Sequence, residues 1–397
     1  MAWSVALAAT FTMTVSYIDR TTFSVLALSV TKDLGISETA YGWLTSAFNI
    51  AYLIATPLAG WWIDRVGARR GLVWSVLVWT AVAALHAVVP GFAVLFVLRL
   101  ALGIAEGPSF PGAAQTVQRV LPASERERGF GVLFTGSSIG GMIAPLLASA
   151  LFALAGWRLA FVGTALAGLV WVPIWLWVTR SPEVRAQLDQ APVAADRAPH
   201  ATFRELVAHP VMVRALLAVF AVAPIAGFSL GWGSKFLGTT FGVTQAQVGQ
   251  YLWIPPLMFD AGAILFGDLA SRQQRPPGTP PRLLFSIAVP LAASLALLPF
   301  ATTPWTAMVI LGTAMVGAGA IYTFVAADLL SRVPPASVSF AGGIMAGAQS
   351  LALIAMGPLV GYSVEIYAGY EVATTVIGAL VLPGCIAWLL WLPRAFR

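Results

Sequence analysis

Two charged side chains, Asp19 and Arg20, interrupt an apolar stretch that runs from about residue 4 to residue 30. A charge near the centre of a bilayer costs about 3 kcal/mol or more, so membrane helices seldom carry one without a use for it. A later apolar stretch carries Arg99 and Glu106, which are seven residues apart and therefore share one helix face, about 10 Å apart along the axis. Ionisable groups in such positions are typical of an ion or substrate pathway.

The four charges constrain how their helices are turned. Asp19 and Arg20 are adjacent, so on a helix their side chains diverge by about 100°. We expect Arg20 to face a central cavity and Asp19 to face the helix that carries the other two charges, with Arg99 near one or both carboxylates. The alternative is a buried ion-pair network that only fixes helix packing. Four charges on two helices are expensive for packing alone, which favours a functional role.

The composition places this chain in a membrane. Of the 397 residues, 59% are hydrophobic and 10% are charged, whereas a soluble domain carries about 25% charged residues. The apolar runs are close to the roughly 20 residues that a helix needs to cross a bilayer, and they lack the alternation of a barrel strand. We predict an all-α membrane protein with twelve transmembrane helices. The predicted spans are 4–30, 40–62, 71–90, 92–118, 129–154, 157–178, 211–236, 246–270, 283–301, 304–330, 338–362 and 371–393.

One long polar stretch, residues 179–210, divides these spans into two sets of six. We predict an amino-terminal six-helix bundle over residues 1–178, a linker over 179–210 with a short interfacial helix at 203–207, and a carboxyl-terminal six-helix bundle over 211–397. A six-plus-six layout indicates repeated bundles with a substrate site between them near the midplane, worked by rocking one against the other.

The net charge of +6 reflects topology rather than nucleic-acid binding. Most of the 22 basic residues follow the even-numbered spans or end the chain, so the positive-inside rule predicts a multi-pass protein of the inner (plasma) membrane with both termini and the linker in the cytoplasm. The single cysteine, Cys385, excludes an internal disulfide and is too isolated for a metal site. The chain has no HExxH or GxSxG motif, so we expect neither an enzyme nor a metal or organic cofactor. A single copy suffices for such a layout, and we expect a monomer.

The segment GWWIDRVGARR, from Gly60 to Arg70, closes the second predicted span. Its glycine permits close helix approach, its acid can face the positive end of a neighbouring helix, and its arginines hold the loop at the inner surface. The segment resembles the loop signature of the major facilitator superfamily, which implies that fold and a cytoplasmic gate. The gate residues are Gly60, Asp64, Arg65, Gly67, Arg69 and Arg70.

Further motifs resemble the anion:cation symporter family, which carries organic acids. In the first half they are Tyr17-Ile-Asp19-Arg20, Arg99-Leu-Ala-Leu-Gly103-Ile-Ala-Glu106-Gly107 and Gly156-Trp157-Arg158. In the second half, Trp232-Gly-Ser-Lys235-Phe-Leu and Asp260-Ala-Gly262 resemble the hexuronate-transporter branch, although Ser234 and Phe236 replace its proline and tyrosine. The resemblance assigns proton coupling to Asp19 and Glu106 and places Tyr52 at the substrate.

We expect Arg20 to bind the substrate carboxylate and Lys235 to assist it. Arg99 is expected to tune the two acids and to belong to the substrate-binding site. The other candidates for substrate binding are Asp260, Trp232 and Gln349. The alternatives are that Lys235 extends to the outer interface and that Asp260 is a helix-packing partner. If Arg20, Arg99, Lys235, Asp19, Glu106 and Asp260 all face one cavity, their charges cancel, and an anion enters more easily with a proton. We therefore predict import of a small organic anion, a hexuronate, an aldonate or a similar carboxylate, with H⁺ as the coupling ion. The alternative is a proton-coupled drug or metabolite exporter of the same fold, against which two arginines within the membrane argue.

Overall fold

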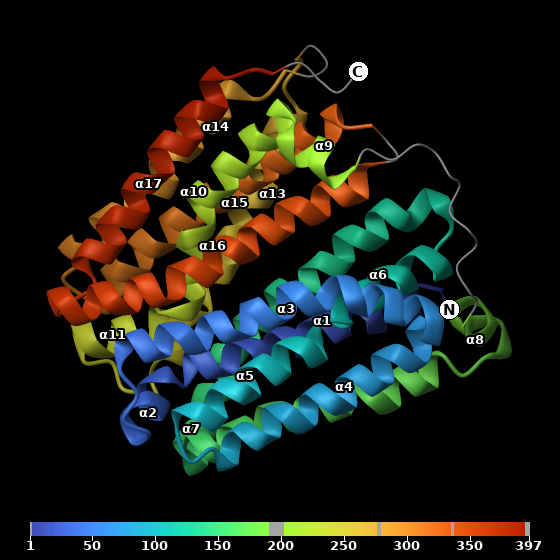
Figure 1. Ribbon diagram of the computed structural model, residues 1–397, viewed down its shortest axis with the longest axis horizontal. Helices are drawn as coiled ribbons and strands as arrows, with labels where there is room; N and C mark the ends of the chain where they lie inside the picture. Colours follow the sequence, from blue (N-terminus) through green and yellow to red (C-terminus); the bar gives the residue numbers. More distant parts are fainter. Residues whose placement is uncertain (1, 190–201, 276–278, 335–336, 394–397) are drawn as a thin grey trace. The chain divides into compact units, whose positions relative to one another are not determined.

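The computed structural model describes residues 2–189, 202–275, 279–334 and 337–393, and every regular element in these ranges is a helix. Nine helical segments of this part of the chain are long and apolar enough to cross a membrane. One of them, Arg128–Val178, has 51 residues. It bends at Ala155 and Gly156, whose backbone leaves the helical region (φ −153° and +76°), so it contains the fifth and sixth predicted spans. Figure 1 shows the helices along the chain.

The contacts divide the chain into two units. Unit 1 comprises residues 1–193 and 233–253, and unit 2 comprises 194–232 and 254–397. The helices of unit 1 are α1 (Ala2–Val25), α2 (Ala27–Asp33), α3 (Glu38–Val66), α4 (Ala68–Leu85), η1 (His86–Val88), α5 (Phe92–Glu106), α6 (Ser109–Val120), η2 (Ala123–Glu125), α7 (Arg126–Val178), α8 (Pro182–Asp189), α11 (Gly233–Phe241) and α12 (Gly249–Leu252).

The helices of unit 2 are α9 (Phe203–Ala208), α10 (Pro210–Gly231), α13 (Ile254–Ser271), α14 (Arg282–Ala293), η3 (Ser294–Phe300), α15 (Pro304–Arg332), α16 (Val338–Tyr367) and α17 (Glu371–Leu390). The short helix α9 confirms the element predicted at 203–207. A capping box stabilises its amino-terminal end. The Thr202 hydroxyl accepts a hydrogen bond from the Glu205 N–H, and the Glu205 carboxylate accepts one from the Thr202 N–H.

Four predicted spans are interrupted helices. The first breaks at Leu26, between α1 and α2, and the fourth breaks at Gly107 and Pro108, between α5 and α6. The seventh and eighth break near Trp232 and Trp253. Proline explains the fourth break, because Pro108 has no N–H group to continue the helix ladder.

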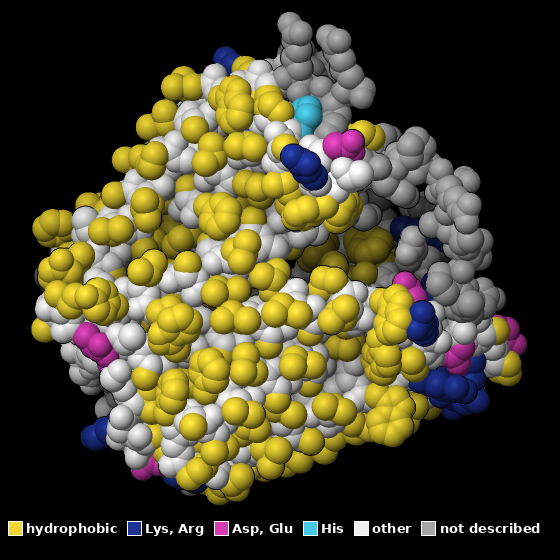
Figure 2. Space-filling model, viewed as in Figure 1, with side chains coloured by type: hydrophobic (Ala, Val, Ile, Leu, Met, Phe, Trp, Pro, Cys, Tyr) yellow, Lys and Arg dark blue, Asp and Glu magenta, His cyan; other side chains and the backbone are white. Residues whose placement is uncertain are grey.

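Large apolar side chains are exposed on the surface of both units. Leu154, Ile264 and Leu58 are 83%, 70% and 65% exposed. In Figure 2, hydrophobic side chains cover the middle of the face that is shown, and charged side chains lie toward its margins. A surface of this kind is stable in hydrocarbon, where every backbone group is already paired inside a helix.

Small residues bring the helices that carry the candidate site together. On α7, Gly136 lies against the backbone of Thr10 and Gly140 against that of Thr14, both in α1. Gly103 of α5 lies against the Phe48 carbonyl of α3. A side chain at any of these positions would push the paired backbones apart, so glycine sets the helix spacing here as it does in other membrane helix pairs.

Close packing at Gly136 has a measurable consequence. We expect Gly136→Ala to lower the free energy of unfolding in detergent by about 1–3 kcal/mol, the usual cost of overpacking, because its Cβ would collide with the Thr10 carbonyl. Gly131→Ala on the same helix is the control, since a Cβ there meets no heavy atom within 4 Å. Chemical denaturation of both variants measures the difference, and equal stabilities would contradict this packing.

Candidate functional site

A buried ion pair joins α1 to α5. The Arg20 guanidinium donates to Oε2 of Glu106 through Nη2 (3.1 Å) and Nε (3.3 Å). The Ser16 hydroxyl donates to the same oxygen at 2.8 Å. The Glu106 side chain is fully buried and that of Arg20 is 20% exposed. Three donors on one oxygen stabilise the ionised carboxylate, while Oε1 has no hydrogen-bond partner among the described residues.

Aromatic rings surround the cation of this pair. The Arg20 guanidinium carbon lies 4.4 Å from the ring centre of Tyr52 and 4.7 Å from those of Tyr17 and Phe48. Phe48 and Tyr52 stack on each other along α3, with ring centres 5.7 Å apart. Ring faces attract a guanidinium and replace some of the hydration that it loses. Of the predicted substrate residues, the structure therefore brings Tyr52 directly to Arg20.

Arg99 is held differently. It lies on α5 and is 3% exposed. Its guanidinium packs against the rings of Phe23 and Phe48 at 4.7 and 5.0 Å, and its Nε donates to the Leu44 carbonyl at 3.5 Å. The described residues give it no ion pair, and its Nη1 has no partner among them. Its charge acts electrostatically on Glu106, which lies two turns along the same helix, without a hydrogen bond between the two side chains among the described contacts.

Asp19 points away from the ion pair. It is 2% exposed and lies beside Trp79 of α4 and Gly168 of α7, in the third and sixth predicted spans. This differs from the predicted orientation toward the helix of Arg99 and Glu106. The reason is the divergence of adjacent side chains: once Arg20 turns to α5, Asp19 must turn to another neighbour of α1. The negative charges of Asp19 and Glu106 still repel each other.

Lys235 belongs to unit 1 by its contacts. The side chain, on α11, is almost fully buried, and its Nζ lies 2.9 Å from both Oε1 of Glu38 and Oγ1 of Thr31. The ring of Tyr41 is 5.2 Å away. Its ammonium group is thus buried and paired within unit 1 instead of extending to the outer interface, which was one alternative. Its partner Glu38, the first residue of α3, was not foreseen.

Three predicted substrate residues lie in unit 2. Trp232 follows α10 and is buried, with its ring centre 6.2 Å from that of Tyr370. Asp260 on α13 and Gln349 on α16 are both half-buried. These three side chains thus come from three different parts of unit 2.

The predicted gate segment is an ordered turn between α3 and α4. Gly67 has a φ of +85° and donates its N–H to the Ile63 carbonyl at 2.8 Å. A Cβ at Gly67 would lie 2.8 Å from Oδ1 of Asp189, at the end of α8. Only glycine combines this backbone angle with such a close neighbour. The sequence reasoning missed α8, which lies inside the stretch predicted to be a linker.

The charged gate residues make side-chain contacts. Asp64 accepts a hydrogen bond from Nε2 of Gln115 in α6 at 2.6 Å. Arg65 lies over the ring of Trp61 at 3.6 Å. Arg69 donates to Oγ1 of Thr179 at 3.2 Å. Of the other gate residues, Gly60 is half-buried and Arg70 is exposed.

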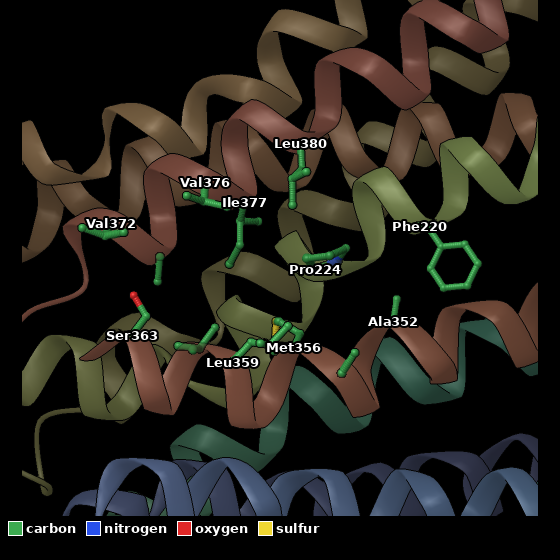
Figure 3. A pocket seen from close by; sticks show the side chains of 13 residues that line it. Phe220, Pro224, Ala352, Met356, Leu359, Ser363, Val372, Val376, Ile377 and Leu380 are labelled. Atoms are coloured by element: carbon green, nitrogen blue, oxygen red, sulfur yellow. The ribbon is translucent and has the colours of Figure 1, made fainter. Parts of the chain in front are cut away.

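Unit 2 contains a cavity that the sequence did not indicate. Its volume is about 280 Å³, and its lining from α10, α16 and α17 is almost entirely apolar. Figure 3 shows side chains of α16 and α17 pointing toward one another across it. The Ser363 hydroxyl is the polar group at one end. The lining includes Phe220, Pro224, Met356, Leu359, Ile377 and Leu380.

Comparison with known proteins gives the class of this chain. Residues 9–355 match the Major Facilitator Superfamily, so the chain belongs to this family of membrane transporters and not to a family of enzymes. A solved bacterial homolog of the human lysosomal transporter Spinster, in an inward-facing and unoccupied conformation, superposes with a TM-score of 0.79 at 19% identity and covers 97% of this chain and 96% of its own. The fold class predicted from the sequence is thereby confirmed.

Curated relatives indicate which branch of this family the chain resembles. A probable galactarate/D-glucarate transporter of Bacillus subtilis is 24% identical over 98% of this chain and 91% of its own length. A D-galactonate transporter of Escherichia coli is 26% identical over 96% of this chain and 93% of its own length. Both of these relatives are named as transporters of sugar acids, and the resemblance to that branch is confirmed.

The ion pair can be tested by its energetic coupling. We expect Arg20→Met and Glu106→Gln each to destabilise the protein, because each leaves a buried partner unpaired. The double variant should be more stable than the sum of the single losses predicts, with a coupling of about 0.5–3 kcal/mol. The exposed pair Arg158 and Asp33 (2.7 Å) provides the control cycle, for which much weaker coupling is expected. Strict additivity at Arg20 and Glu106 would contradict the contact.

Proposed function

We propose that this protein is a proton-coupled symporter that imports a small organic anion of the sugar-acid class by alternating access. The observation that carries the proposal is the Arg20–Glu106 ion pair, in which a guanidinium and a buried carboxylate neutralise each other's charge. The names of the relatives support the substrate class. The proposal includes inner-membrane location with both termini in the cytoplasm, and function as a monomer.

The pair supplies a mechanism for coupling. While Glu106 is ionised, it occupies the donors of Arg20 and competes with any anion for them. A proton on Glu106 removes the negative charge, which frees the guanidinium for a substrate carboxylate, and Arg20 binds such a group through a planar pair of N–H donors. Proton and anion then enter together because each makes the other's binding favourable. Asp19 is the second proton carrier. The positive charge of Arg99 acts electrostatically on the carboxylate of Glu106.

The remaining residues have secondary roles in this proposal. Tyr52 lies against Arg20 and would orient the bound acid, and Trp232, Asp260 and Gln349 would contact its hydroxyl groups. Lys235 would bind the anion only in exchange for Glu38, in the same way as Arg20 exchanges Glu106. The segment from Gly60 to Arg70 would act as the cytoplasmic gate, with α8 packed against Gly67.

A second function, export of lipophilic compounds by the same fold, is favoured by one observation. The cavity of about 280 Å³ in unit 2 has an almost entirely apolar lining (Figure 3), as a site for such compounds would. The two buried arginines of unit 1 disfavour a cationic cargo.

Two substitutions separate substrate binding from proton coupling. We expect Arg20→Ala to abolish substrate binding, since it removes the anion's donor group. We expect Glu106→Gln to retain substrate exchange but to lose accumulation driven by a proton gradient, because glutamine cannot carry the proton. Arg158→Ala and Glu371→Gln, at exposed positions, are matched controls. Normal accumulation by Glu106→Gln would exclude its role in coupling.

The substrate class is tested by uptake into proteoliposomes, with and without an inward proton gradient. The panel consists of labelled glucuronate, galacturonate, galactonate, lactate and an aromatic carboxylate. Accumulation of a sugar acid that collapses with the gradient is the expected result. If no acid accumulates and lipophilic cations move outward, the exporter function replaces the proposal.

A further inference from the structure

The apolar cavity in unit 2 is an elongated groove. Its lining follows α16 from Ala352 to Ser363, about 16 Å at the rise of an α-helix. Along α17 the lining extends from Val372 to Leu380, about 12 Å. Figure 3 shows side chains on both sides of the space, with Ser363 at one end and Phe220 at the other. The cavity is long for its volume of about 280 Å³, so it has room for an extended molecule and not for a broad one.

One side of this groove is open. The side chains of Leu359, Val376 and Leu380 are 65%, 49% and 49% exposed and form its rim, whereas the buried side chains of Val360 and Ile377 form its floor. Both α16 and α17 are long and apolar enough to cross a membrane. The open, apolar rim on these two helices therefore meets the hydrocarbon chains of the bilayer.

The position of the groove along the helices matches one half of a bilayer. The helix α16 ends at Tyr367 and α17 begins at Glu371. The turn between them has to lie at the membrane surface, because non-helical backbone is not tolerated in contact with lipid. Ser363 lies about one helical turn before this end, and Leu380 lies at the middle of α17. The length of about 16 Å is thus close to half of a hydrocarbon core that is about 30 Å thick.

The end of the groove near the membrane surface is polar. The Ser363 hydroxyl is buried and has no hydrogen-bond partner among the described residues, whereas Ser350 of the same helix donates to the Ala346 carbonyl at 3.2 Å. In Figure 3 the Ser363 hydroxyl points into the space. Tyr362 and Tyr367 are exposed near this end, and tyrosine is enriched at membrane–water interfaces. The groove therefore offers a hydrogen-bond donor at the level where lipid ester groups lie.

We propose that this groove is a binding site for one acyl chain of a membrane phospholipid, from the leaflet on the side of the turn between α16 and α17. The ester carbonyl accepts a hydrogen bond from Ser363, and the chain lies along the floor toward Leu380. Water fits less well, because a buried water needs two to four polar partners and the described lining offers one hydroxyl. A sugar acid fits less well, because this lining has no charged side chain to replace its hydration.

The bound chain is a resident part of unit 2 and not a transported molecule. The free chain is already in hydrocarbon, so the hydrophobic effect does not favour the bound state over the free one. Binding comes instead from the dispersion contacts that an empty groove lacks, together with the hydrogen bond to Ser363. A chain in this place fills the space between α10, α16 and α17. The site does not depend on the proposed symport.

Photocrosslinking of the wild type in proteoliposomes tests the site and its direction. Two phosphatidylcholine probes carry a diazirine on one acyl chain, either beside the ester or at the middle of the chain, and mass spectrometry locates the adducts. We expect the first probe to label Ser363 and Val372 and the second to label Met356 and Leu380. Ile264 of α13, which is exposed outside the groove, reports ordinary lipid contact. Labelling of the groove below that of Ile264, or one pattern for both probes, would overturn the proposal.

A substitution that fills the groove provides the second test. Ala355 is an exposed residue of the lining, and we expect Ala355→Phe to lower labelling of the groove by about tenfold, which corresponds to about 1.4 kcal/mol. Labelling of Ile264 should not change. Ala379→Phe, at an exposed position of α17 outside the lining, is the matched control and should behave like the wild type.

Two results would contradict the proposal in this second test. Unchanged labelling of the groove in Ala355→Phe would show that the chain does not occupy this space. Displacement of the probe from the wild type by the lipophilic cation tetraphenylphosphonium would assign the groove to an exported compound instead of a resident lipid. Because neither readout involves transport of an acid, failure of the proposed symport leaves this test unaffected.

Discussion

The buried ion pair between Arg20 and Glu106 constrains everything around it in unit 1. Two charges removed from water lose hydration worth several kcal/mol each, and they are tolerated only with good geometry and additional donors. Ser16 provides a further donor, and the faces of Tyr17, Tyr52 and Phe48 enclose the guanidinium. These contacts bring side chains of α1, α3 and α5 together, and Gly103 lets α5 approach the Phe48 carbonyl of α3 closely. A proton or a competing anion at this point therefore acts on the packing of three helices at once.

The sequence is sufficient to predict the fold class, because this depends on local composition and on the length of the apolar runs, whereas it did not indicate that four of the predicted spans are interrupted helices. The orientation of Asp19 could not be derived in the same way. It depends on the rotation of α1 about its axis, which is set by contacts of Gly136 and Gly140 with backbone atoms more than a hundred residues earlier in the chain. Nothing in the local pattern around Asp19 encodes those contacts.

The same limit applies to Lys235 and to the gate. The lysine's partner, Glu38, lies about 200 residues earlier in the chain, at the start of α3. From the sequence alone, a residue at such a helix end is expected to be exposed. The gate motif was recognisable, but its packing against α8 was not, because a polar and proline-containing stretch is typical of a linker. In both cases the decisive partner is an ordinary surface-type residue, and only the tertiary structure selects it from many equivalent candidates.

The break at Leu26 leaves the Val25 carbonyl outside the helix ladder, and two later side chains bind it: Ser234 donates at 2.7 Å and Gln245 at 2.6 Å. The segment 233–253 that supplies them belongs to unit 1 by its contacts, although α10, which precedes it, belongs to unit 2. During synthesis, unit 1 consequently lacks part of its structure until about residue 253 has left the ribosome. The Val25 carbonyl therefore gains these two side-chain donors only after α10, a helix of the other unit, has been synthesised, so unit 1 is not completed in the order of the chain.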